Sequence, residues 1–207
     1  MQRTFYRIIL PLLCAILAGC GVLSVNPISP PDKNIKDKSL LGVWTIKDGS
    51  SSIFIHIGQL DENKMKAVYI EHKENGELDM GFFSIYPSNI DAHKFLNLQF
   101  IEPDGKPNED LNLYIFLKYK FKSPDVLSVM FLSSDLIEKA VEEKELIGIL
   151  PKREPALKLE NKDQPSVHIM KNYFEITDSS ANIAKFIHRY GAGRLFEKEL
   201  LLNRYKQ

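Results

Sequence analysis

Apolar and polar residues alternate along most of the chain between residues 40 and 132. In the segment 52–57, Ile53, Ile55 and Ile57 fall on one face, and in 111–121 every odd-numbered residue is apolar. A period of two is typical of a half-buried β-strand, because successive side chains point to opposite faces of a sheet. The same pattern predicts further strands at 42–46, 64–72, 77–86, 94–101 and 126–132.

Short turn sequences separate these segments. Asn75 and Gly76 form the strongest hairpin signal, because both residues accept the positive φ angles of a tight turn. A Pro-Asp-Gly sequence at 103–105 and a Ser-Pro-Asp sequence at 123–125 mark two more turns. Connections this short cannot carry parallel crossovers, so the pattern predicts an antiparallel meander of about seven strands. Closure into a barrel, or a strongly curled sheet, would protect its edges.

Helical spacing appears only after residue 132. A first helix is predicted at 135–148, with Asp135 and Glu138 at its start and Gly148 at its end. After a polar loop at 151–165, residues 167–176 are consistent with one bent strand or a strand pair. A second helix follows a cap at 177–179 and stops at Gly191, and 195–202 is expected to add a last amphipathic turn or two. The predicted fold is mainly β (α+β), with two or three accessory helices toward the C-terminus.

The N-terminal segment combines a positive start with a short apolar run. Arg3 and Arg7 precede residues 8–18, which are too few to span a bilayer comfortably, and Leu-Ala-Gly-Cys follows at 17–20. This tetrapeptide resembles the lipobox of bacterial lipoproteins. The resemblance implies a signal peptide at 1–19 and a Cys20 that carries a diacylglycerol and an amide-linked acyl chain at the mature N-terminus.

The lipobox resemblance also implies a location and a domain plan. The protein is expected in the cell envelope, held on the membrane through lipidated Cys20, and Gly21 favours the periplasmic face of the outer membrane if the host has two membranes. Prolines at 27, 30 and 31 predict an extended, flexible tether over residues 20–39. Residues 40–207 would then form a single β-rich domain with C-terminal helices.

The first predicted strand opens with a distinctive triplet, Gly42-Val43-Trp44. It resembles the G-x-W opening of lipocalin-like barrels, in which the tryptophan plugs the barrel floor, so Trp44 is the expected floor residue. The chain has no Thr-Asp-Tyr triplet, and no late arginine to pack on the indole is identifiable. The wider layout is similar to a group of uncharacterised bacterial lipoproteins, a resemblance that implies no activity.

Composition narrows the possible partners. Twenty-seven basic and 27 acidic residues balance, which gives no electrostatic reason to expect nucleic-acid binding. The two cysteines fall at positions 14 and 20, so the predicted domain contains neither a thiol nor a disulfide.

No segment carries a recognisable catalytic or metal-binding pattern. None of the histidines has a partner at metal-ligand spacing, although His56 and His72 could approach each other across neighbouring strands. The five histidines are His56, His72, His93, His168 and His188. No nucleophile elbow or dinucleotide loop is present either. We therefore expect no catalytic residues, no metal and no cofactor.

The sequence thus favours a non-enzymatic binding module for a small apolar or amphipathic ligand inside the barrel. The alternative is a scaffold or accessory subunit that binds another envelope protein. Inward apolar side chains could fill the barrel, or aromatic side chains could line a cavity, and the alternation does not separate these cases. The candidate aromatic residues are Tyr69, Phe82, Phe100 and Tyr119.

Overall fold

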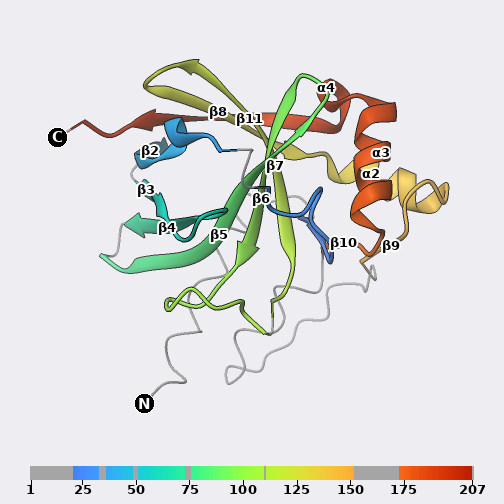
Figure 1. The fold of residues 1–207 in the computed structure, drawn as a ribbon, viewed down its shortest axis with the longest axis horizontal. Helices are drawn as coiled ribbons and strands as arrows, with labels where there is room; N and C mark the ends of the chain where they lie inside the picture. Colours follow the sequence, from blue (N-terminus) through green and yellow to red (C-terminus); the bar gives the residue numbers. More distant parts are fainter. Residues whose placement is uncertain are drawn as a thin grey trace.

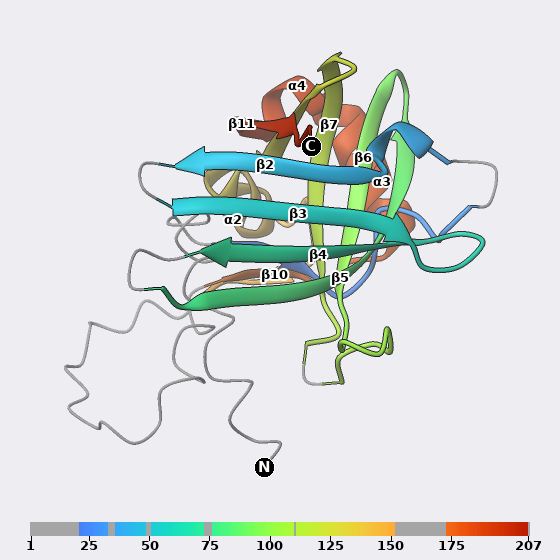
Figure 2. The same cartoon turned by 90° about the vertical axis from the view of Figure 1, so that its left-hand side faces the viewer.

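Eight antiparallel strands close into a barrel in the computed structural model, which describes residues 21–32, 36–48, 51–72, 76–109, 111–151 and 173–206 (Figures 1 and 2). The barrel strands are β2 (Gly42–Asp48), β3 (Ser51–Gln59), β4 (Met65–His72), β5 (Leu78–Ile90), β6 (His93–Phe100), β7 (Tyr114–Ser123), β8 (Val126–Leu132) and β11 (Phe196–Arg204). The predicted signal peptide at 1–19, Cys20, Asn75 and His168 lie outside the described residues.

Hydrogen bonding runs around the whole barrel. Consecutive strands pair from β2 to β8, and β11 pairs with both β8 and β2. Every neighbouring pair is antiparallel, as the short turns predict. The expectation of a mainly β, lipocalin-like barrel is therefore confirmed.

The alternating pattern places one face of each strand inside the barrel. Ile53 and Ile57 are buried in the interior cluster, and Ile55 packs against it. From β7, Ile115, Leu117 and Tyr119 join the same cluster. The period of two therefore identified the inward face of both strands correctly.

The last barrel strand, β11, differs from the conformation that the sequence predicts for this segment. Residues 195–202 were expected to form an amphipathic turn, but Phe196–Arg204 is extended between β8 and β2. Leu200 and Leu202 face the interior, whereas Leu201 is exposed. Glutamate, lysine and leucine are good helix formers, so local propensity favours a helix here. Pairing with two neighbouring strands outweighs that propensity.

A second layer covers one side of the barrel. Strands β1 (Val22–Ser24), β10 (Phe174–Ile176) and β9 (Gly148–Ile149) continue the sheet from β7, in that order. Helices α2 (Ser134–Glu142), α3 (Ser180–Tyr190) and α4 (Ala192–Leu195) gather on the same side in Figure 1. A second buried cluster fills the space between these helices and the strands, with Phe95, Phe116, Ile176, Ile183 and Phe186 among its members.

Of the two longer helices, α3 has its predicted ends, whereas α2 is shorter than predicted. Helix α3 begins after Ser179, whose hydroxyl accepts a hydrogen bond from the Asn182 N–H, and it ends at Gly191 with φ of 82°. Helix α2 ends at Glu142 instead of residue 148. Gly148 lies in β9, where an added Cβ would meet the Glu175 carbonyl oxygen at 2.7 Å. This glycine therefore permits close strand packing and does not terminate the helix.

The segment predicted as a flexible tether is partly built into the fold. Val22–Ser24 forms a strand, and the Gly21 carbonyl accepts a hydrogen bond from the Phe174 N–H at 2.9 Å. Further along, Ile28 is 1% exposed, and its N–H donates to the buried Asn97 side chain at 2.8 Å. The prolines are compatible with this course because they disfavour helix without preventing an extended chain from packing.

Asn97 is the residue that fastens this segment to the barrel wall. Its Oδ1 accepts from Ile28, and its Nδ2 donates to the Ser88 hydroxyl at 2.6 Å.

Asn97→Ala would leave both groups without this partner in a buried site, which costs about 2 kcal/mol of unfolding free energy. Denaturant unfolding followed by Trp44 fluorescence measures the loss. Asn89→Ala, at an exposed position of β5, is the matched control, and equal stability of the two variants would contradict the assignment.

Candidate functional site

One end of the barrel is closed by the residues that precede β2. Trp44 is fully buried, and its indole Nε1 donates to the Leu40 carbonyl oxygen at 2.8 Å. Leu40 ends the short 3-10 helix η2 (Lys38–Leu40) and is itself fully buried. The indole therefore ties the entering chain to the first strand, and we call this region the closed end.

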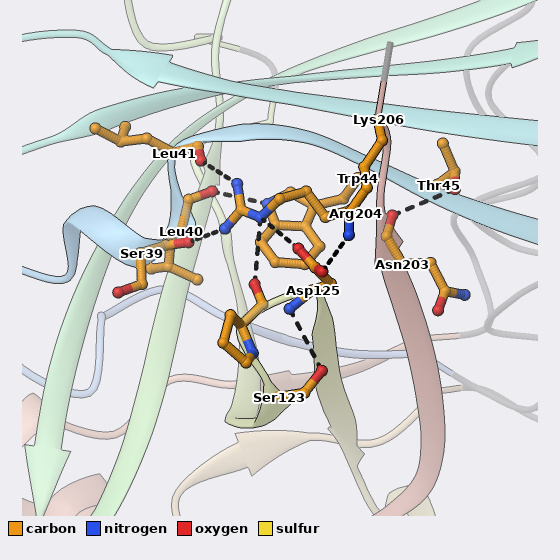
Figure 3. Close-up of polar contacts among 11 residues, drawn as sticks. Ser39, Leu40, Leu41, Trp44, Thr45, Ser123, Asp125, Asn203, Arg204 and Lys206 are labelled. Atoms are coloured by element: carbon orange, nitrogen blue, oxygen red, sulfur yellow. Dashed lines mark hydrogen bonds and ion pairs between the residues drawn. The ribbon is translucent and has the colours of Figure 1, made fainter.

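Arg204, on the last strand, covers the other side of the same indole (Figure 3). Its Cζ lies 4.2 Å from the centre of the Trp44 ring. Its guanidinium donates to the carbonyl oxygens of Leu41 at 2.8 Å and Ser39 at 2.7 Å. One side chain therefore joins the start of the first barrel strand to the end of the last.

This contact overturns the expectation that no late arginine packs on the indole. Arg204 lies directly opposite Trp44 in the pairing of β11 with β2. The arginine was missed because residues up to 202 were expected to be helical, a conformation that gives no cross-strand register. If 196–204 is treated as a strand that pairs with β2, the register places Arg204 opposite Trp44.

The glycine of the Gly-x-Trp triplet has its own physical reason. Gly42 adopts φ of +127°, which side chains rarely tolerate, and a Cβ there would lie 2.7 Å from Arg204 Nη1. Residues two apart on a strand share a face, so Gly42 leaves room for the guanidinium beside the indole of Trp44. The triplet and Arg204 thus form one unit, which we call the latch.

Asp37 fastens the entering chain at a second point. Its carboxylate accepts hydrogen bonds from Lys94 Nζ at 2.9 Å and the Tyr119 hydroxyl at 3.1 Å, and from the Ser39 N–H. Burial raises the pKa of this carboxyl, but the hydrogen bonds and the charge of Lys94 together hold it below its ordinary value. Asp37 is therefore a structural anion in neutral solution.

We call the end of the barrel opposite the closed end the far end. Near the latch, Met65, Leu96 and Leu127 are buried, and toward the far end Ile46 and Ile53 are buried as well. Further apolar side chains pack against the interior cluster but are only partly buried, at both ends of the barrel. These residues are Leu41, Ile55, Leu98, Leu111, Leu113, Phe121, Phe131, Tyr173 and Leu200. Part of the apolar surface around the barrel cluster is therefore exposed to solvent.

Polar side chains also enter the interior toward the far end. Glu71 and Asp79 are each 2% exposed and lie opposite one another on β4 and β5. The Tyr69 hydroxyl donates to Glu71 Oε2 at 3.4 Å. Burial, and then the charge of Glu71, raises the pKa of the Tyr69 hydroxyl well above its ordinary value. Tyr69 therefore stays a neutral hydrogen-bond donor.

The four aromatic residues proposed as cavity lining separate into two groups. Tyr69, Phe100 and Tyr119 are buried members of the interior cluster. Phe82 lies outside that cluster, and Lys66 Nζ lies 5.2 Å from the centre of its ring. Phe82 therefore does not share the interior with the other three candidate lining residues.

A surface pocket of about 340 Å³ lies beside the closed end, where η2 meets the β3–β4 turn. Its walls mix both charges, with Lys36, Asp37, Glu62 and Lys64 among the lining residues. Leu41 and Met65, which also contact the interior cluster, form its apolar wall.

The two histidines of neighbouring strands do not face each other. His56 pairs with Val68 and His72 with Ser52, so the two are not opposite each other on β3 and β4. His188 Nδ1 contacts Asp91 at 2.8 Å on the surface. Among the described residues, no group of three or more His, Cys, Asp or Glu side chains could hold a metal ion. Whether the protein binds a metal stays a prediction.

None of the helices in the described ranges is long and apolar enough to cross a bilayer. Comparison with protein-family models, with curated proteins and with solved structures found no match.

We expect Arg204→Ala to lower the unfolding free energy by about 2–3 kcal/mol, because a charge-assisted set of hydrogen bonds and a cation–π contact disappear. Trp44 emission should also shift to longer wavelength as water reaches the ring. Arg204→Lys should recover only part of the stability, since an ammonium cannot donate in a planar fork.

The exposed Arg194 of α4 provides the control for this experiment. Arg194→Ala should change neither stability nor emission. If Arg204→Ala behaves like Arg194→Ala, the latch does not stabilise the barrel.

Proposed function

We propose that this chain is a lipid-anchored protein of the cell envelope whose barrel binds a small apolar or amphipathic molecule without chemical change. The anchor is proposed from the Leu-Ala-Gly-Cys sequence at 17–20 and the short apolar run before it. If the host has two membranes, we place the protein on the periplasmic face of the outer one. The binding role is supported by the interior of the barrel.

The observation that supports the binding role is that several apolar side chains packed against the barrel cluster are only partly buried. Leu98 on β6, Phe131 on β8 and Leu200 on β11 face the barrel cluster and still retain exposed surface. Apolar surface inside a concave site is the common lining of small-molecule sites. A ligand that covers these side chains would gain the free energy of removing their surface from water.

Polar groups toward the far end favour a ligand that carries a hydrogen-bonding group as well as a hydrocarbon part. Glu71 and Asp79 bring carboxyl groups into the interior beside the Tyr69 hydroxyl. Specificity in mostly apolar sites comes from a few placed polar groups. An amphipathic molecule, with its hydrocarbon part toward the partly exposed leucines and a hydrogen-bonding group toward these residues, fits this distribution.

The charged side chains of the closed end are assigned to structure. Arg204 is committed to backbone carbonyl groups and to Trp44, and Asp37 to Lys94, Tyr119 and Ser39. These contacts hold the entering chain and the barrel ends together. We therefore assign no catalytic role to either residue.

A second candidate function is that of a scaffold or accessory subunit that binds another envelope protein. It is favoured by the large number of inward side chains that are already buried, including Ile53, Ile85, Leu117 and Val129. A barrel that its own side chains fill would have to act through its outer surface. Ligand binding and scaffolding therefore predict opposite results for substitutions inside the barrel.

The lipid anchor is tested by Cys20→Ser. The variant should remain an unprocessed precursor without the added lipid mass, because the serine hydroxyl cannot form the thioether. The unchanged protein should begin at Cys20, carry the lipid and partition into detergent. Intact-mass measurement of both proteins, expressed in a host that processes lipoproteins, decides the question. Normal cleavage of the variant would contradict the anchor.

Ligand binding is tested by a pair of neighbouring substitutions on β11. Leu200→Phe adds volume to the interior, whereas Leu201→Phe adds the same volume to an exposed position. We expect Leu200→Phe to weaken binding of a fluorescent fatty-acid probe by about tenfold, equivalent to about 1.4 kcal/mol, and Leu201→Phe to leave it unchanged. Mass spectrometry of molecules that co-purify should show the same contrast.

Denaturant unfolding of both variants separates blocked binding from overpacking. Equal probe affinity of the two variants, with both folded, would remove the interior as the binding site. The scaffold function would then be favoured.

A further inference from the structure

The residues that follow Cys20 are fixed to the protein body from the first described position. The Gly21 carbonyl oxygen accepts from Phe174, and the Val25 N–H donates to the Ile176 carbonyl oxygen, both at 2.9 Å. Between these bonds, β1 pairs in parallel with β10 from Val22 to Ser24. Consecutive Cα atoms are about 3.8 Å apart, so a lipid on Cys20 is attached one residue away from this sheet.

The segment stays fastened beyond β1. The Asn26 side chain donates to the Asp178 carbonyl oxygen at 3.0 Å, and the Ile28 N–H donates to Asn97 Oδ1 at 2.8 Å. The Ser29 hydroxyl then contacts the Ser88 hydroxyl at 2.7 Å. These contacts leave no free rotation between the anchor residue and the barrel at residues 21–29.

The small sheet formed by β1, β10 and β9 has one face against the helices. Val22, Phe174 and Ile176 belong to the cluster that the helices cover. At Gly148, an added Cβ would lie 2.9 Å from the Val141 side chain of α2. Side chains alternate along a strand, so the neighbours of Gly148 point away from α2.

The opposite face of this sheet is buried at Leu23, which packs in the barrel cluster, and exposes apolar side chains beyond it. Ile147 is 64% exposed, Ile149 is 59% exposed, and Val25 at the end of β1 is 41% exposed. The register sets Leu23 beside Glu175 and Glu175 beside Ile149, so these side chains share the face that carries Val25 and Ile147. Val25, Ile147 and Ile149 form what we call the anchor-side face.

The anchor-side face lies within the reach of the lipid. Neighbouring strands are about 4.8 Å apart, so β9 lies roughly 10 Å from β1. The end of β9 that carries Ile149 is also the end where Gly21 enters the sheet, because β1 and β10 run in parallel and β9 runs opposite to both. A lipid at Cys20 therefore brings Ile149 close to the interfacial region of the same membrane.

We propose that the anchor-side face rests on the bilayer that holds the lipid of Cys20, so that the domain is docked on the membrane in one orientation. This inference rests on the proposed anchor. The bilayer is the occupant because the anchor begins at the edge of this sheet, and isoleucine and valine gain free energy on entering the interface. Glu175 is compatible with this contact, since it is half-buried and accepts the Tyr173 hydroxyl at 3.3 Å.

Single labelled cysteines on the intact lipoprotein test the orientation. In the proposed lipoprotein, acylation consumes the thiol of Cys20, and cleavage of the leader removes Cys14. An introduced cysteine is then the one reactive thiol of the mature chain. Ile147→Cys and Ile149→Cys place an environment-sensitive fluorophore on the anchor-side face. Leu201→Cys is the matched control, because Leu201 is also an exposed apolar residue and β11 lies above β10 in both Figures 1 and 2.

Each labelled protein is reconstituted into vesicles of phosphatidylethanolamine and phosphatidylglycerol that contain nitroxide-labelled lipid. We expect blue-shifted emission and at least twofold stronger quenching at positions 147 and 149 than at 201. Trp44 emission checks that every variant is folded, and intact mass checks that Cys20 carries its lipid.

The other outcomes overturn the proposal in distinguishable ways. Equal quenching at all three positions, with the lipid present, would show a domain that turns freely on its anchor and would leave the lipoprotein assignment intact. An apolar environment at 147 and 149 in protein produced without residues 1–20, which carries neither leader nor lipid, would show that the chain itself covers this face. Shielding in native membranes but not in protein-free vesicles would assign the face to a protein partner. Absence of lipid at Cys20 would overturn the anchor and the docking together.

Discussion

A cation–π and hydrogen-bonded contact reinforces the backbone pairing that closes the barrel between its two terminal strands. Arg204 lies over the indole of Trp44 and donates to carbonyl groups of the chain that enters β2. A closed barrel must join its first and last strands, which form the contact of greatest sequence separation. Fixing that contact costs the most chain entropy, and a buried indole that binds a guanidinium concentrates the compensating interaction at one point.

The order of strands followed from the sequence, but the closing strand did not. Alternation at Ile53–Ile55–Ile57 and along 111–121 identified the inward faces correctly, because those positions are buried by neighbours close in sequence. β11 is surrounded by β2 and β8, both distant along the chain, and its residues locally favour a helix. Since Arg204 acts only in the register of that strand, the latch was missed together with the strand.

The prediction of a flexible tether at residues 21–29 was wrong for a related reason. Prolines at 27, 30 and 31 exclude helix, which is compatible with both a free tether and a segment that packs in an extended form. Val22, Leu23 and Ile28 were the apolar residues that distinguish these cases, because all three are buried. Their partners are Phe174, Asn97 and the barrel, which are distant in the sequence. A local pattern of residues does not predict such long-range contacts.

The small sheet links the two cores of the protein. β1 pairs with β7 of the barrel through Ser24 and Tyr114. Leu23 packs in the barrel interior, whereas Val22 packs with the helices. Alternate side chains of one short strand therefore join both cores, and that strand begins two residues after Cys20. An orientation imposed through the proposed lipid at Cys20 would therefore act on both cores at once, because β1 contacts both of them.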